Sequence, residues 1–446
     1  MRIFKNKICK RVVSLLSIVA FFFCMDWGVG QLIQPISYAT YFNHDLEMIE
    51  KSDYDSMVVF VGASRVYRTF VPKIFEEAWN VDCVLNAGSS SQPICGTYYE
   101  LKDLVERVHP QKVYIGVTVD QLTENPAENL QGRLIVYDRL NLKNRFLMGL
   151  KCFNFEEREY FLNAYRYKDR LTKKKIKKHL KKVKKLKAAN YKDNPKKNEY
   201  YADKGFVYNK DSFKTGTMKI TEGADFSDDL IIKENLTYLD KCVDLCKKNN
   251  IEVHLVSGVT TVMRMYVSAG YQKSVDFYTE YAKKKGIRYY NLNFLKDREK
   301  NLPDEMMHDY NHLNGEGANI TSEIFAEIVK KEEAGEDISS YFYKDLDDFK
   351  KDVKRIVAVN ADIQEDKDKE NVLHLQLTSL QNDDVKPRYR VSVRYSKGEN
   401  YQVLSDWNES KKAEVKVAKK SGYTIRVEAG AENKELGTAC RYYKFK

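Results

Sequence analysis

The sequence predicts an α/β protein with a three-layer parallel sheet, followed by an all-β, sandwich-like domain at the C-terminus. Short apolar β-type runs alternate with amphipathic helical patterns, which predicts a parallel sheet covered on both faces. After about residue 345, apolar residues alternate with a period of two, and turn residues separate the segments. The chain has 446 residues, enough for two or three domains and a large core.

The first part of the α/β pattern contains three expected strands. They are predicted at Met57–Val61, Val81–Leu85 and Lys112–Val119, with helical patterns at Pro72–Trp79 and about Gly96–Val108 between them. The carboxyl ends of parallel strands lie along one edge of the sheet, where α/β proteins place their sites. We therefore expect the residues that follow these strands to face one another.

The pattern resumes later in the chain. The expected elements are a helix at Leu230–Asn249, a strand at Ile251–Ser257, a helix at Tyr271–Lys285, a strand at Ile287–Leu292 and a final helix capped by Asn314. We expect one α/β domain over about residues 50–335, interrupted by a large insertion at about residues 121–229.

The insertion holds a lysine-rich segment, residues 168–187, in which Ile176, Leu180 and Val183 recur at helical spacing. Its twelve cations against one carboxylate equal the net charge of the whole chain, which is +11. The remaining charges balance, so we expect no nucleic-acid partner. A basic amphipathic helix binds anionic surfaces, and we expect Lys173–Lys187 to contact one. A solvated helix that packs its apolar stripe on the body is the alternative.

The N-terminus combines a basic flank with a long apolar run. The flank carries Arg2, Lys5, Lys7, Lys10 and Arg11, and the run extends to about Ile33 with Asp26 as its only charged interruption. This pattern predicts a signal anchor over residues 1–35, a single transmembrane pass with its N-terminus inside. The protein is then expected at the cell membrane, with its remaining chain extracytoplasmic. A signal peptide cleaved near Ser37–Ala39 is the alternative.

The C-terminal region, residues 350–446, has the period-two pattern of an immunoglobulin- or fibronectin-like sandwich. Strands are predicted at Val372–Leu377, Tyr389–Tyr395, Ala413–Val417 and Tyr423–Val427. No residue pattern in this region suggests chemistry, so we expect it to pack on, or to present, the α/β domain.

Two segments carry residue types suited to nucleophilic catalysis. Ser64 follows the first strand directly, and Asp309 and His312 lie in one loop before the final helix. A serine nucleophile needs a neutral imidazole to accept its proton, and that imidazole needs an acceptor on its other nitrogen. Asp309 and His312 can supply both functions. A surface turn with local capping by Asp309 is the structural alternative.

The loop after the second strand contains Asn86, Gly88 and Ser91, and small residues there let backbone N–H groups approach a substrate oxygen. In this order, the three blocks resemble those of the SGNH (GDSL-type) hydrolase superfamily over roughly residues 55–330. The resemblance implies a flavodoxin-like parallel sheet with Ser64 as nucleophile, His312 as general base and Asp309 as the acid that orients it. It also implies an oxyanion hole built from the Ser64 N–H and from Gly88 or Ser91.

The resemblance is incomplete in two blocks. Arg65 follows the serine, and Val119 stands where the superfamily usually carries an asparagine that donates to the oxyanion. Loss of one such donor costs about 3 kcal/mol of transition-state stabilisation. Thr118, or a group from the insertion, is expected to replace it, and Arg65 is expected near the substrate.

The predicted function is an extracytoplasmic serine-dependent acyl transfer, by an O-acyltransferase or an esterase, on a cell-envelope polysaccharide or other polymer. An anchored chain with a degenerate third block resembles the branches of the superfamily that acylate envelope polymers. Expected partners are the polymer, an acyl donor and a membrane-bound protein that delivers acyl groups. We expect no metal and no cofactor, because the eight cysteines form no Cys-x-x-Cys pair. A non-catalytic envelope scaffold on a decayed fold is the alternative.

Overall fold

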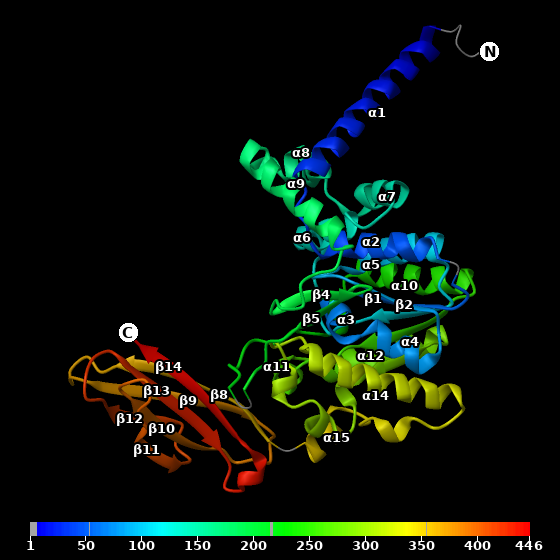
Figure 1. Ribbon diagram of the computed structural model, residues 1–446. Helices are drawn as coiled ribbons and strands as arrows, with labels where there is room; N and C mark the ends of the chain where they lie inside the picture. Colours follow the sequence, from blue (N-terminus) through cyan, green and yellow to red (C-terminus); the bar gives the residue numbers. More distant parts are fainter. Residues whose placement is uncertain (1–6, 53, 215–216, 354) are drawn as a thin grey trace.

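The computed structural model in Figure 1 describes residues 7–52, 54–214, 217–353 and 355–446. Its α/β part is built on a five-stranded parallel sheet in the order β2-β1-β3-β6-β7. The strands are β1 (Met57–Gly62), β2 (Cys83–Gly88), β3 (Lys112–Gly116), β6 (Glu252–Ser257) and β7 (Arg288–Asn291). Every residue of β1 and β2 is buried, as expected for strands covered on both faces. The predicted α/β architecture is confirmed.

Helices cover both faces of this sheet (Figure 1). One layer contains α2 (Tyr38–Glu50), α5 (Ile94–Val108) and α10 (Lys233–Lys248). The other layer contains α4 (Pro72–Trp79) and α14 (Gly315–Glu333), which pack on each other. Helix α12 (Tyr271–Lys285) belongs to the first layer, beside α10, where Tyr281 and Lys285 bind Asp240. The short helices α3 (Ser64–Thr69), α11 (Val262–Val267), α13 (Arg298–Asn301) and α15 (Leu346–Asp352) connect these elements. One continuous hydrophobic core extends through the layers.

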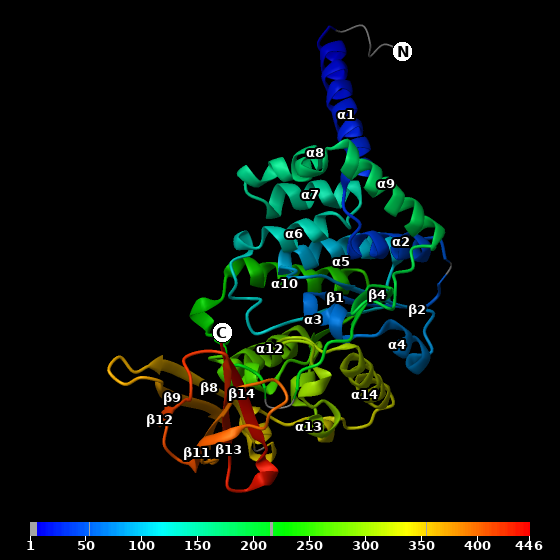
Figure 2. The same cartoon turned by 60° about the vertical axis from the view of Figure 1, so that its left-hand side comes forward.

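The segment between β3 and α10 adds a second group of elements. They are α6 (Leu130–Tyr137), α7 (Leu142–Cys152), α8 (Asn163–Arg166), α9 (Lys173–Ala188) and a hairpin of β4 (Glu199–Asp203) and β5 (Phe206–Asn209). Helices α7, α8 and α9 lie at the end of the molecule from which the N-terminal helix projects, beyond α5 (Figures 1 and 2). The β4–β5 hairpin instead reaches back to β2, where the Asn86 N–H donates to the carbonyl of Lys204 at 2.9 Å. The added segment therefore contacts both the helical layer, at α5, and the edge strand β2.

Short 3-10 turns complete the chain between these elements. They are η2 (Pro126–Glu128), η3 (Glu156–Phe161), η4 (Lys168–Arg170), η5 (Asp228–Leu230), η6 (Leu292–Phe294), η7 (Asp304–Met306), η8 (Ser339–Tyr341) and η9 (Lys434–Leu436).

The N-terminal apolar run forms helix α1 (Lys7–Ile33), while Arg2 and Lys5 of the basic flank lie outside the described residues. None of the helices in the described part of the chain has both the length and the apolar character needed to cross a membrane. The expected anchor over residues 1–35 is therefore not supported there. Asp26, its charged interruption, is buried and accepts hydrogen bonds from the N–H groups of Asn163 and Ala164, at 2.8 and 2.9 Å. The carboxylate thus caps the N-terminus of α8.

The C-terminal region forms two antiparallel sheets that share a hydrophobic core. One has the order β12-β9-β8, with β8 (Ile356–Glu365), β9 (Val372–Gln381) and β12 (Lys412–Lys416). The other has the order β11-β10-β13-β14, with β10 (Arg388–Arg394), β11 (Gln402–Asn408), β13 (Tyr423–Gly430) and β14 (Thr438–Phe445). The sequence predicted four of these strands and missed β8, β11 and β14. Most β11 residues are exposed or half-buried, so its sequence carries little apolar alternation.

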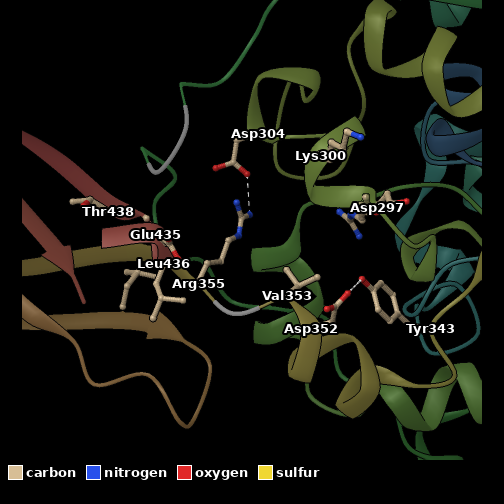
Figure 3. A pocket seen from close by; sticks show the side chains of 13 residues that line it. Asp297, Lys300, Asp304, Tyr343, Asp352, Val353, Arg355, Glu435, Leu436 and Thr438 are labelled. Atoms are coloured by element: carbon tan, nitrogen blue, oxygen red, sulfur yellow. Dashed lines mark hydrogen bonds and ion pairs between the residues drawn. The ribbon is translucent and has the colours of Figure 1, made fainter. Parts of the chain in front are cut away.

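A cavity of about 420 Å³ lies where the antiparallel sheets meet the α/β part. Figure 3 shows the Arg355 side chain there, directed at Asp304, with a nitrogen–oxygen distance of 3.1 Å. Tyr343 donates a hydrogen bond to Asp352 on the opposite side. In the part of the chain that the structure describes, this cavity shares no lining residue with the pocket around Ser64.

Candidate functional site

Ser64 is the first residue of α3, directly after β1, and glycines at the ends of three adjacent strands allow this helix to lie close to the sheet. A Cβ atom added at Gly116 would lie 2.2 Å from Cγ2 of Val66, and one added at Gly88 would lie 2.6 Å from the backbone nitrogen of Tyr67. Gly62 has a φ of +148°, which side chains rarely adopt. These glycines therefore fix where α3, and with it Ser64, can sit.

The structure brings Ser64, His312 and Asp309 together, although 248 positions separate the first two. The distance from Ser64 Oγ to His312 Nε2 is 2.7 Å, and His312 Nδ1 lies 2.8 Å from both carboxylate oxygens of Asp309. The Ser64 hydroxyl donates to Nε2 when Nδ1–H donates to the carboxylate. This is the hydrogen-bonding chain that a serine nucleophile needs.

The loop that carries the acid and the imidazole is closed on itself. The His308 N–H donates to the His312 carbonyl at 2.9 Å, and Met307 and Leu313 form an antiparallel bridge. One oxygen of Asp309 also accepts the N–H groups of Asn311 and His312, at 2.7 and 3.0 Å. These bonds hold the carboxylate in one place beside Nδ1 of the imidazole.

The surroundings set the charge states of this pair. Burial, and the cations of Arg65 and Arg68, hold the pKa of His312 below its usual 6.5, although Asp309 acts in the opposite direction. Burial opposes ionisation of Asp309, but hydrogen bonds from His308 and His312 outweigh it and hold that pKa well below its usual range. At neutral pH, the pair is therefore a carboxylate beside a neutral imidazole, as a general base requires.

His308 is a member of the site that the sequence analysis missed. Its Nε2 lies 2.9 Å from Asp309 Oδ2, and its ring stacks on that of His312 at a centroid distance of 5.9 Å. Its position directly before Asp309, in a chain with only 7 histidines, was the available signal. Among the described residues, His308, Asp309 and His312 are also the group close enough to share a metal ion, with ligand atoms within 4.8 Å of one another. Both imidazoles already contact the carboxylate.

Ser64 and His312 line a polar pocket of about 710 Å³. Arg65, Ser91 and Thr118, three of the residues expected near a substrate, line it. The other lining side chains are mostly amides and carboxylates: Gln92, Asp120, Gln121, Glu124, Asn125, Glu128, Asn129, Asn235 and Asn311. Burial, with repulsion from Asp120, raises the pKa of Glu124 to about 7. The walls are thus suited to a substrate with many hydrogen-bonding groups.

Asn86 and Gly88 do not line this pocket, which corrects two of the predicted substrate contacts. The buried Asn86 amide donates to the carbonyls of Val66 and Phe70, at 2.9 and 2.7 Å, and so ties β2 to α3. The Gly88 N–H donates to the Asn86 side chain at 3.2 Å and is therefore engaged. Both residues support the helix that carries Ser64, and neither lines the pocket.

Ser91 remains the residue of this loop that faces the pocket. It adopts a left-handed backbone with a φ of 50°, which is uncommon for a residue other than glycine and is frequent at functional sites. Its carbonyl accepts a hydrogen bond from the Asn129 side chain at 2.5 Å. The inserted segment therefore helps to fix the backbone of this loop.

Thr118 lies in the pocket but does not replace the missing asparagine donor. Its hydroxyl donates its proton to Asp120, at 2.6 Å, so that proton is not available to a substrate. Val119 is buried, and its side chain has no hydrogen-bond donor. Among the described residues, the Arg65 guanidinium lines the pocket without a hydrogen bond or ion pair to another side chain. Arg65 is therefore better placed than Thr118 to donate a hydrogen bond to a group bound beside Ser64.

Neither a protein-family model nor a curated protein matches the sequence. One solved structure that is similar to this chain is that of a Bacteroides fragilis protein described as an acylhydrolase. It is 11% identical, with a TM-score of 0.33, over 67% of this chain and 99% of its own. Another, a gut microbial diltiazem-metabolizing enzyme, is 11% identical, with a TM-score of 0.22, over 81% of this chain and 73% of its own. Likenesses this weak carry no argument about chemistry, which rests on the geometry above.

Proposed function

We propose that the protein is a serine-dependent acyl-transfer enzyme of the SGNH hydrolase type, with Ser64 as its nucleophile. The observation that carries the proposal is the unbroken chain of contacts from Ser64 Oγ through His312 to Asp309, at 2.7 and 2.8 Å. These three residues lie beside a pocket at the carboxyl ends of β1 and β3, the edge at which parallel sheets place their sites.

The reaction follows from the positions of the protons. His312 Nε2 accepts the Ser64 proton as Oγ attacks the ester or thioester carbonyl of a donor, and Asp309 steadies the imidazolium that forms. His312 then protonates the leaving group, which leaves an acyl-Ser64 ester. In the second half, His312 accepts the proton of the acceptor hydroxyl as its oxygen attacks this ester. The imidazolium returns the proton to Ser64.

The oxyanion of each tetrahedral intermediate needs donors that already point at it. The Ser64 N–H is the first in α3 and has no partner within the helix. The Ser91 N–H and the Arg65 guanidinium are the other groups we assign to this role. A cation beside the developing charge offsets the loss of the usual asparagine.

The acceptor we propose is a hydroxyl of a cell-envelope polysaccharide or related polymer. Support comes from the pocket, whose amide and carboxylate walls match a ligand with many hydroxyl groups. The placement outside the cytoplasmic membrane, and a membrane-bound partner that supplies acyl groups, rest on the N-terminal sequence pattern alone. Water as the acceptor would make the same site an esterase.

A non-catalytic binding protein is the second candidate, because Val119 removes a donor that the superfamily usually keeps. A fluorophosphonate probe separates the two, since it labels only a serine that is activated as a nucleophile. We expect the purified full chain to be labelled, and we expect Ser64→Ala and His312→Ala to abolish labelling. Ser421→Ala, an exposed serine in the C-terminal region, is the matched control and should be labelled like the wild type.

If the folded wild-type chain resists the probe, the catalytic proposal fails. Where labelling succeeds, release of acetate from an activated acetyl ester, compared with transfer to an oligosaccharide, distinguishes esterase from transferase. Transfer that exceeds release identifies a polymer hydroxyl as the acceptor.

A further inference from the structure

Helix α7 carries an exposed apolar stripe. Leu142, Phe146 and Leu150, spaced four residues apart, are 81%, 65% and 46% exposed, and Phe155 beyond the helix is 78% exposed. The opposite face buries Asn144 and Met148, and the Asn144 amide donates to Asp103 of α5 at 2.9 Å. Large apolar side chains in one exposed row are atypical of a free protein surface and mark an interaction site.

The lysine-rich helix α9 lies at the same end of the molecule as this stripe (Figures 1 and 2). Polar contacts hold α9 against α1. A ring nitrogen of His179 lies 3.2 Å from the Gln31 carbonyl, and Arg170, just before α9, donates to the Ile33 carbonyl at 2.6 Å. All ten lysines between residues 173 and 187 are exposed. The structure thus turns the buried side of α9 to α1 and leaves its charges in solvent.

The arrangement of layers gives the direction of the stripe. Helix α5 lies between α7 and the sheet, so the face of α7 opposite α5 points away from the body, toward the side from which α1 projects (Figures 1 and 2). The projecting part of α1 is itself exposed and apolar at Val12, Leu15 and Ile18. Apolar and basic groups therefore meet at one end of the molecule.

We propose that this end, formed by Leu142, Phe146, Leu150 and the lysines of α9, is a docking surface for an anionic lipid bilayer. Apolar side chains enter the boundary between headgroups and acyl chains, while lysines pair with anionic headgroups, as amphipathic interfacial helices do. A soluble polyanion would use the lysines but would gain nothing from the stripe. The combination of both features at one pole therefore favours a lipid surface, whatever reaction the Ser64 site performs.

Flotation of the full chain with vesicles tests the proposal. The vesicles are phosphatidylcholine alone, or phosphatidylcholine with about 30% phosphatidylglycerol. Phe146→Ser with Leu150→Ser removes the stripe, and Val403→Ser with Tyr442→Ser, exposed apolar residues of the C-terminal sheets, is the matched control. Because α1 is unchanged in every variant, its own contribution cancels.

We expect the α7 variant to bind both kinds of vesicle about ten-fold more weakly, and its control to bind within about two-fold of the wild type. A triple variant, Lys177→Gln, Lys178→Gln and Lys181→Gln, should bind the anionic vesicles about ten-fold more weakly and the neutral vesicles like the wild type. High salt should reduce this difference, because it screens the lysine charges. Its control replaces the exposed Lys411, Lys412 and Lys416 in the same way.

Two outcomes would overturn the proposal. If the α7 variant binds both vesicles like the wild type, lipid does not cover the stripe, and a protein partner becomes its better occupant. If only the lysine variant loses binding, α9 contacts polyanions by charge alone. Since every substituted side chain is exposed, unchanged thermal unfolding of each variant should confirm that the fold is intact.

Discussion

At the scale of residues, Ser64 becomes a candidate nucleophile through groups that are remote in sequence. His312 alone would titrate near 6.5, but its burial and the Arg65 and Arg68 cations keep it neutral and able to accept a proton. Asp309 stays ionised because two imidazoles and two backbone N–H groups share its oxygens. The same local fold that orders the loop therefore also prepares its chemistry.

The pH dependence of the reaction follows from these charges. Because the pKa of His312 lies below 6.5, kcat/KM for a small neutral ester should rise through a limb below pH 6.5, and a smaller change near pH 7 is expected only if Glu124 in the pocket wall contacts the ester. Initial rates from pH 4.5 to 8, with stability checked at each pH, measure this limb. A midpoint above 6.5 would show that the imidazole carries its proton more readily than this environment allows.

Arg65 is expected to act on both the oxyanion and the imidazole. Arg65→Gln removes a donor and a cation, so kcat should fall by roughly ten- to a thousand-fold, while KM changes little. The pH limb should also move upward, because loss of a positive charge makes protonation of His312 easier. Lys73→Gln, an exposed position on α4, is the control for charge alone. A variant that raises only KM would assign Arg65 to substrate binding.

Residue patterns in the sequence were sufficient to select Ser64, Asp309 and His312, which the structure brings into contact, because each follows or precedes an element with a clear period. They could not separate residues that face the substrate from residues that support it. Asn86 and Gly88 sit in the predicted loop, yet both turn inward toward α3. His308 was missed because its contact with Asp309 depends on the closed turn, which its position beside Asp309 in the sequence does not reveal.

At the scale of elements, α3 can approach the sheet only because the strands beneath it end in glycine. The predicted strand after Lys112 was expected to reach Val119, but β3 ends at Gly116, where Val66 of α3 occupies the space of a side chain. Val117 still donates its N–H to Val256 of β6, but Val119 lies in the hydrophobic core beyond the end of the strand. The periodicity therefore predicted the existence of the element more reliably than its end.

Gly116→Ala tests this packing. The new Cβ would lie 2.2 Å from Val66 Cγ2, so α3 must shift or the side chain must repack. We expect a loss of about 1–3 kcal/mol in the free energy of unfolding. Because Ser64 belongs to α3, we also expect probe labelling to slow. Gly28→Ala, in helix α1 where nothing lies within 4 Å of the new Cβ, is the control and should lower neither the free energy of unfolding nor the labelling rate. Equal behaviour of the two variants would remove the steric role assigned to Gly116.

At the scale of the whole molecule, the antiparallel sheets and the α/β part meet at a cavity distinct from the Ser64 pocket. The sequence predicted both parts, because their periods differ, but it contained no signal for how they join. Arg355 and Asp304 meet there although neither belongs to a motif. Contacts between parts depend on surfaces that only the folded chain creates.

Arg355→Gln should separate stability from activity. The substitution removes an ion pair to the buried Asp304 carboxylate, so we expect a loss of about 1–3 kcal/mol in the free energy of unfolding. The labelling rate of Ser64 should stay the same, since this cavity does not contain the site. Denaturant unfolding and probe labelling of the same preparation measure the two. Slower labelling by a folded variant would indicate that the junction influences the pocket.

The central claim is that Ser64 carries the acyl group during turnover. Mass spectrometry of the full chain, quenched in acid during reaction with an activated acetyl ester, tests this most directly. The account predicts one added acetyl group, located on the peptide that contains Ser64 and absent from both Ser64→Ala and His312→Ala. Ester turnover with no acyl group on Ser64, or with turnover unchanged in Ser64→Ala, would contradict it.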